Sequence, residues 1–107
     1  MTAIEVRIFE RAGEFAADKD EARTLREIAI MPALSNGVEV VLNFAGVQFA
    51  TQSFIHALIS AALRSIGEDA LDLLVFAECT EAVQAIIETV VDYTLYSPPG
   101  PEPSMSS

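Results

Sequence analysis

Hydrophobic and polar residues alternate along residues 3–9, with apolar side chains on one side and charged side chains on the other. A period of two predicts a strand with one face in water. Residues 38–44 carry apolar side chains on both faces, which is typical of a strand inside a sheet. Residues 71–76 form another nearly continuous apolar run and predict a further strand. A weaker pattern after Gly13 indicates a short strand over residues 14–17.

A helical period follows the short strand predicted at residues 14–17. Asp18 is suited to cap the start of the helix, because its carboxylate can accept hydrogen bonds from the open amides of the first turn. Apolar residues then recur at helical spacing toward the core: Ala22, Leu25, Ile28 and Ala29. Pro32 does not fit a helix interior, so we expect the regular helix to end or kink near Ile30.

Two further helices are predicted in the second half of the chain. The central one opens near residues 51–53 and runs to Ile66, with Gly67 as its stop. The last one follows Thr80, a suitable N-cap, and ends before Ser97. Its apolar stripe has the spacing i, i+3, i+4, i+7 and consists of Val83, Ile86, Ile87 and Val90.

The alternation of strands and helices predicts an α/β fold. We expect a small mixed sheet of four to five strands, with about three helices packed mainly on one face. The strands at 38–44 and 71–76 should form a parallel pair, because the helix between them is a crossover connection. Residues 1–96 are expected to form the domain. Residues 97–107 contain four prolines and little apolar content, which predicts a disordered tail.

Composition narrows the class of protein. Hydrophobic residues make up 51% of the 107 residues, which is enough for the core of one domain. The net charge of −10 would repel phosphate backbones and argues against nucleic-acid binding. The same charge would keep the protein soluble, or it would attract a basic patch on a protein partner. No apolar run reaches the ~18 residues of a membrane span, and no signal-peptide pattern is seen. The lone Cys79 fits a reducing cytoplasm.

The stretch VLNFAGV at residues 41–47, followed by Ser53 and Phe54, resembles the STAS-like domain family of unknown function. The pattern of that family is a strand ending in Asp-Phe-x-Gly-Val, then a helix that starts with a Ser-Phe pair. The resemblance covers roughly residues 4–95, the extent of the predicted core elements. More distantly, the chain is similar to the STAS domains of anti-sigma factor antagonists.

The resemblance implies a STAS-like fold and a non-enzymatic regulatory role in protein–protein interaction and signalling. In the antagonists, a serine at the start of the corresponding helix is phosphorylated by a serine kinase of the histidine-kinase-like ATPase type. Alignment on the motif places Ser53 at that position. The implied partner is therefore such a kinase or another regulator. The expected docking residues are Asn43, Thr51, Gln52, Ser53 and His56.

Simpler interpretations exist for each candidate residue. Ser53 and Thr51 both suit the first turn of a helix as capping residues, and Thr51 is the better placed cap. A phosphate on Ser53 would meet open amides and add about −2 charge to a surface expected to be acidic. His56 is expected to be a partly exposed helix residue, and with Cys79 it supplies too few ligands for zinc.

No set of residues indicates an enzyme or a cofactor. The acidic residues around the last strand are expected to form a solvated rim: Glu68, Asp69, Asp72, Glu78 and Glu81. Asn43 stands where the resembled family carries Asp, and His56 and Ala57 replace an acidic pair. These departures support an alternative, a constitutive structural or oligomerisation module, including a homodimer, with no phosphorylation switch.

Overall fold

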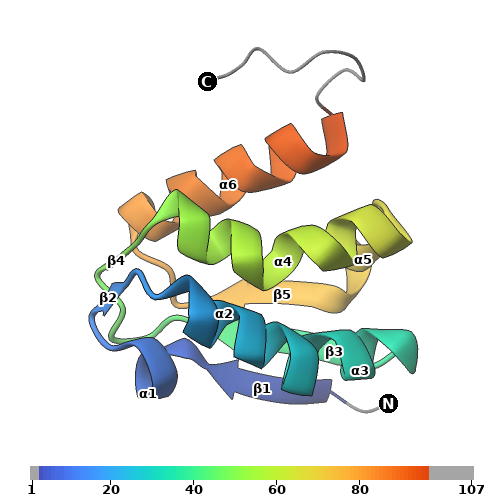
Figure 1. The fold of residues 1–107 in the computed structure, drawn as a ribbon, viewed down its shortest axis with the longest axis horizontal. Helices are drawn as coiled ribbons and strands as arrows, with labels where there is room; N and C mark the ends of the chain where they lie inside the picture. The colour runs from blue at the N-terminus through green and yellow to red at the C-terminus, as the bar shows by residue number, and fades with distance from the viewer. Residues whose placement is uncertain (1–2, 97–107) are drawn as a thin grey trace.

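The computed structural model describes residues 3–96, so the predicted tail at 97–107 lies outside the described residues. Three strands form the main sheet in the order β1-β3-β5 (Figure 1). They are β1 (Ala3–Arg7), β3 (Glu39–Asn43) and β5 (Leu74–Ala77). Both pairings are parallel, which confirms the crossover predicted between the second and third of these strands.

Strand β3 lies inside the sheet, as its apolar content on both faces predicted. Val41 pairs with Glu5 on one side and with Val75 on the other. Val40 and Leu42 point to the same face of the strand, because they are two residues apart. Both are fully buried beneath the helices.

A second sheet consists of two very short strands, β2 (Phe15–Ala16) and β4 (Phe49–Ala50), which also pair in parallel. The rings of Phe15 and Phe49 stack with their centroids 5.5 Å apart. The prediction of one mixed sheet is therefore wrong in its arrangement, because the five described strands form two sheets without an antiparallel pair. Helix α1 (Ile8–Ala12) follows β1 directly and separates it from β2.

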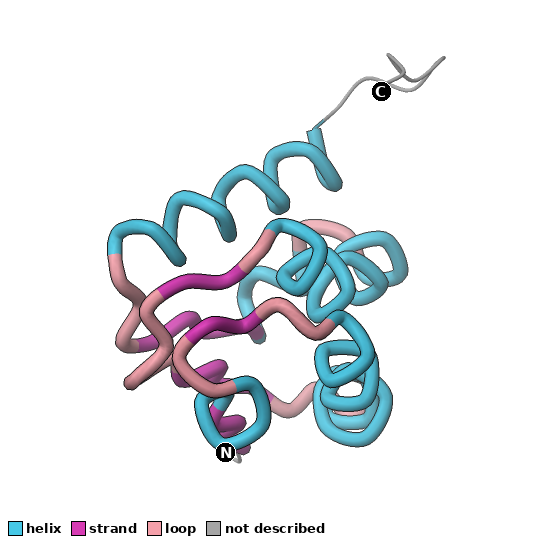
Figure 2. The backbone as a smooth tube through the Cα atoms, turned by 60° about the vertical axis from the view of Figure 1, so that its left-hand side comes forward, coloured by secondary structure: helices cyan, strands magenta, loops and turns pink. Residues whose placement is uncertain are grey.

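The three longest helical segments lie along one side of the main sheet, as expected. Helix α4 (Gln52–Ile66) lies between α2 (Lys19–Leu25) and α6 (Glu81–Tyr96) and packs against both (Figures 1 and 2). Within the described residues, no helix is long and apolar enough to cross a membrane.

The apolar run at residues 71–76 is only partly a strand. Its first half belongs to the short helix α5 (Asp69–Leu73), and only Leu74 onward is extended. Ala70 and Leu74 are both buried, a spacing of four residues that a helical turn brings to one side. The prediction of a strand from residue 71 is therefore wrong by three residues.

The regular helix α2 ends at Leu25, and the chain stays helical past the expected break near Ile30. A π-helical turn, η1 (Arg26–Ile30), connects α2 to α3 (Met31–Ser35). Pro32 lies in the first turn of α3, directly after the π turn. The wider turn changes which residues face the core, so that Ile28 is 60% exposed while Ile30 is fully buried. The assignment of Ile28 to the core is therefore wrong, because a regular helical period was assumed through the π turn.

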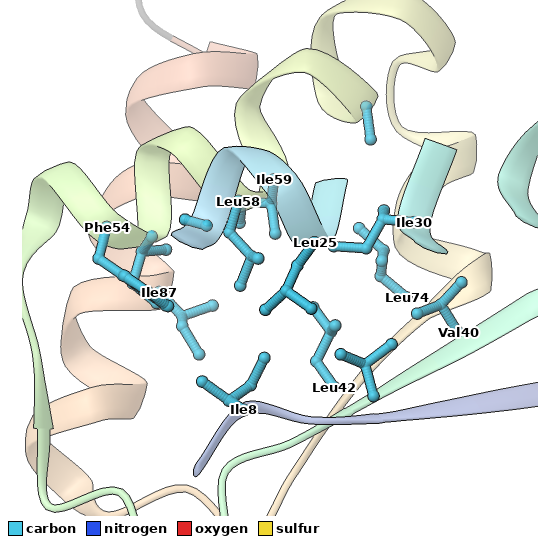
Figure 3. Packing of buried hydrophobic residues seen from close by; sticks show 14 of the residues in the cluster. Ile8, Leu25, Ile30, Val40, Leu42, Phe54, Leu58, Ile59, Leu74 and Ile87 are labelled. Carbon is cyan, nitrogen blue, oxygen red and sulfur yellow. The ribbon is translucent and has the colours of Figure 1, made fainter. Parts of the chain in front are cut away.

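The core fills the space between the helices and the main sheet (Figure 3). Its labelled members come from every layer of the fold: Ile8, Leu25, Ile30, Val40, Leu42, Phe54, Leu58, Ile59, Leu74 and Ile87. This packing holds α4 in place and leaves one narrow stripe of the helix toward solvent.

The turn after β3 explains the glycine of the motif at residues 41–47. The N–H of Val47 donates to the carbonyl of Phe44 at 2.9 Å, and Gly46 between them has φ +90°. A Cβ atom on Gly46 would lie 2.8 Å from Cδ1 of Phe9, which is closer than real side chains approach. Both the backbone angle and the neighbouring ring therefore require glycine here.

The π turn gives a first prediction. Ile28→Ser should change the free energy of unfolding by no more than about 0.5 kcal/mol, because the side chain is on the surface. Ile30→Ala should cost about 2–5 kcal/mol, because it opens a cavity in the core. Urea unfolding of both variants measures the difference. Equal losses would show that α2 keeps a regular helical register.

Gly46 gives a second prediction, with Gly37 as the matched control. Gly37 has φ +72° but no atom within 4 Å of an added Cβ, so Gly37→Ala should cost only the strain of a left-handed residue, about 1–2 kcal/mol. Gly46→Ala should cost more, because it also displaces the ring of Phe9. In a Phe9→Ala background the two losses should become similar. A Gly46→Ala loss that Phe9→Ala leaves unchanged would contradict the steric explanation.

Candidate functional site

The start of α4 is held by Thr51. Its hydroxyl oxygen accepts a hydrogen bond from the N–H of Phe54 at 3.1 Å, and its own N–H donates to the carbonyl of Ala16 at 2.9 Å. Thr51 is thus the N-cap, as predicted, and it ties α4 to β2. Because Thr51 caps the helix, Gln52 and Ser53 extend from the first turn as exposed residues.

The outer face of α4 forms the floor of an open groove of about 660 Å³. Small side chains cover much of this floor: Ser53, Ala57, Ser60 and Ala61. The basic residues of α2 and of the π turn form one wall, and Val90 and Tyr93 of α6 form the other. We call this hollow the α4 groove.

Positive charge is concentrated along this groove. The chain has only six lysines and arginines, and four of them line the groove: Lys19, Arg23, Arg26 and Arg64. Arg23 is paired with Asp20 at 3.0 Å, and Arg26 with Glu27 at 3.0 Å. The Arg23–Asp20 pair is exposed and is worth only about 0–1 kcal/mol, so Arg23 can exchange this partner for another.

His56 lies on the floor between these cations and is half-buried. Its Nε2 is 3.4 Å from Nη2 of Arg64, and its Nδ1 is 3.5 Å from the hydroxyl of Ser60. Since a guanidinium only donates, Nε2 accepts and the proton of the neutral ring is on Nδ1. Burial, and then the charge of Arg64, lower the pKa of His56 below its ordinary value. Both causes favour the neutral form of the imidazole.

The predicted docking residues separate into two places. Gln52, Ser53 and His56 line the α4 groove, with Thr51 beneath them as the cap. Asn43 lies at the end of β3, where its amide donates to a carboxylate oxygen of Glu5 at 2.8 Å and its carbonyl oxygen accepts from the N–H of Ala45. The expectation that Asn43 belongs to the same surface is therefore wrong, because it points to the face of the sheet opposite the helices.

The basic wall was missed from the sequence, although part of its signal is present there. Lys19, Arg23 and Arg26 are four and three residues apart, which predicts one face of a helix. Arg64 comes from another helix and joins them only through the fold. The expectation of an acidic surface around Ser53 is wrong, because it took the net charge of the chain for the local charge.

The acidic residues near β5 do not form a metal site. Across residues 3–96, no three His, Cys, Asp or Glu side chains gather closely enough to bind an ion. Cys79 is half-buried, and burial together with the charge of Glu78 raises the pKa of its thiol. Thr80 caps α6 as predicted, accepting from the N–H of Val83 at 3.1 Å.

Comparison with protein families places this fold. The family model described as a STAS-like domain of unknown function (DUF4325) matches residues 21–84. The chain belongs to this family. The match extends from α2 to the first turn of α6 and includes the whole of α4, which confirms the resemblance seen at residues 41–54. No curated protein and no solved structure matches the chain.

The low pKa of His56 gives a third prediction for this STAS-like domain. A histidine whose folded-state pKa lies below the unfolded one contributes stability that is present above the unfolded pKa and is lost as the pH falls through the folded pKa. The free energy of unfolding should therefore decrease on acidification below about pH 6.5. Urea unfolding between about pH 5 and 7 should show this slope.

His56→Gln should remove that part of the slope, because glutamine keeps polar contacts but does not titrate in this range. Arg64→Gln should reduce the slope, since it removes one of the two causes of the shift. A wild-type slope that survives in His56→Gln would assign the effect to another group.

Proposed function

We propose that this STAS-like domain is a regulatory protein-interaction module that binds an acidic segment of a partner protein in the α4 groove. The observation that carries the proposal is the gathering of four of the six cations of an acidic chain around Ser53. A partner that approaches the molecule is repelled by most of its surface and attracted here. The local charge therefore selects both the docking site and the sign of the charge on the partner segment.

The shape of the groove favours a helix as the docking element. Two helices form its walls and small side chains form its floor, an arrangement in which a third helix can lie between ridges. Carboxylates on that helix would pair with Arg23 and Arg26. The side chain of Arg26 is only 22% exposed, so its pairing is less screened by water than that of a surface arginine.

Phosphorylation of Ser53 would switch this docking. The hydroxyl is exposed in the first turn of α4, where open amides and the positive end of the helix dipole stabilise a phosphate. A phosphate here would also compete for the basic side chains that bind the acidic partner. The resemblance suggests a serine kinase of the histidine-kinase-like ATPase type as the enzyme that adds it.

A constitutive module without a switch is the alternative. The observation that favours it is the replacement of the acidic pair of the resembled family by His56 and Ala57, which leaves fewer groups for a kinase to recognise. The two versions differ in one respect, which is whether a negative charge at Ser53 changes partner binding.

Peptide binding tests the docking site. The probe is a fluorescein-labelled, glutamate-rich amphipathic helical peptide, with a lysine-rich peptide of the same pattern as its control. We expect the acidic peptide to bind and Lys19→Glu/Arg23→Glu to weaken it by at least about tenfold. Arg7→Glu/Arg11→Glu is the matched control, because it makes the same charge change with the two cations outside the groove. Equal weakening by both double variants would show a general charge effect and would overturn the docking site.

The switch is tested by capture of partners from the native cell extract with wild-type protein, Ser53→Glu and Ser53→Ala, read by mass spectrometry. A partner lost only with Ser53→Glu supports switching. A partner retained by all three, yet lost with Lys19→Glu/Arg23→Glu, supports the constitutive module. A concentration-dependent increase in mass by light scattering, together with no captured partner, would support self-association instead.

A further inference from the structure

Strand β5 has an open edge. The carbonyl of Ala77 accepts from the N–H of Phe44 at 2.8 Å, so the backbone groups of Ala77 face β3. The N–H of Leu74 instead donates to Ala70 in the helix before it. Because the backbone groups of successive residues in a strand point to alternate sides, the N–H and C=O of Phe76 face away from β3. Within residues 3–96, no strand pairs with that side.

Helix α6 extends over the space beyond this edge. It packs on α4, and it lies on the side of β5 that faces away from β3 (Figure 1). A hollow of about 710 Å³ lies between the strand and the helix. Phe76, Ile87 and Val91 form its apolar lining. We call this hollow the β5–α6 groove, and it lies on the side of β5 where a further strand would pair.

The rim of the β5–α6 groove is acidic. Glu78, Glu88 and Asp92 line it, and among the described residues no cationic side chain does so. Glu88 accepts a hydrogen bond from the amide of Gln84 at 3.2 Å and is exposed. Glu78 has φ +59°, a left-handed conformation that costs a residue other than glycine roughly 1–2 kcal/mol. Backbone strain of this kind is concentrated at functional positions.

We propose that the β5–α6 groove accepts an extended, basic segment of a partner protein, which pairs with the open edge of β5 as an additional strand. The backbone of the segment bonds with the free N–H and C=O of Phe76. Alternate apolar side chains of the segment pack beneath α6 on Ile87 and Val91. Its lysines or arginines pair with Glu88 and Asp92 at the rim.

Two other occupants do not fit this chemistry. A second copy of the chain would bring its own acidic rim against this one, and like charges across an interface disfavour the contact. Residues 97–107 contain no lysine or arginine, and four prolines without a backbone N–H interrupt the segment. It therefore lacks the positive charge that pairs with the rim, and prolines disfavour the pairing of residues 97–103 as a strand.

The β5–α6 groove is independent of the α4 groove. Val90 and Tyr93 of α6 face the α4 groove, whereas Val91 and Asp92 line the other hollow. One helix therefore separates a basic groove from an acidic one. Variants in either groove can be made without touching the other, so the two proposals can fail separately.

The probe for the experiment is a short fluorescein-labelled peptide of alternating lysine and valine, measured by fluorescence anisotropy. We expect binding, and a loss of at least about tenfold in Glu88→Lys/Asp92→Lys. Glu14→Lys/Asp72→Lys is the matched control, because it makes the same change of charge at two exposed residues that line neither groove. Both pairs are exposed, so the fold should be unaffected, which thermal unfolding verifies. Lys19→Glu/Arg23→Glu should not weaken binding of this peptide.

Strand pairing is tested through the backbone. A peptide with N-methyl groups on alternate residues cannot donate to β5, and it should bind at least about tenfold more weakly than the unmodified peptide. Hydrogen exchange at the amide of Phe76 should slow when the unmodified peptide binds. Equal binding of the methylated peptide, or unchanged exchange at Phe76, would reduce the interaction to surface charge and would overturn the proposal. A dimer that forms through β5 without peptide would also overturn it.

Discussion

The fold depends on the burial of α4 between two helices and a sheet. Its apolar side chains pack on α2 at one side and on α6 at the other, they share one core with the residues of β3, and the largest of them are completely buried. A helix held in this way has only a narrow outer stripe left for solvent. In this chain the stripe consists of small and polar residues, which makes it the floor of a groove rather than a ridge. Packing therefore decides where the candidate site can be.

Local charge in this molecule differs from net charge. An excess of ten negative charges would suggest an acidic surface throughout, yet four of the six cations line the groove on one side of α6 and three carboxylates line the groove on the other. At physiological salt, charges act over about 8 Å, so a binding partner responds to each groove separately. The lowered pKa of His56 follows first from its burial and then from the positive charge of nearby Arg64.

The two grooves have different physical origins. The α4 groove is made of side chains on regular helices, and its affinity would come from charge and from the fit of a helix. The β5–α6 groove is left by the order of strands, since the sheet stops at β5 while the helical layer continues to α6. An uncovered strand edge is usually protected, because it pairs readily with other chains. Here the acidic rim would limit which chains can pair.

The sequence by itself determined the features that depend on nearest neighbours. It placed the caps at Thr51 and Thr80, the interior position of β3, the glycine turn of the motif, and the family. Of the candidate site it gave Ser53 and His56, because both follow from the start and period of one helix. These features are local because hydrogen bonds at a helix end and the alternation along a strand involve only a few consecutive residues.

Only the tertiary structure decided the rest. The π turn reversed the expected burial of Ile28, and the docking of residues 69–73 on the core made a helix of an apolar run. Asn43 lies on the face of the sheet opposite the helices. Arg64 lines the same groove as three cations that come roughly forty residues earlier in the sequence. Each outcome depends on contacts between segments that are distant in sequence. The energies of these contacts exceed the differences in local conformational propensity, which are less than about 1 kcal/mol per residue.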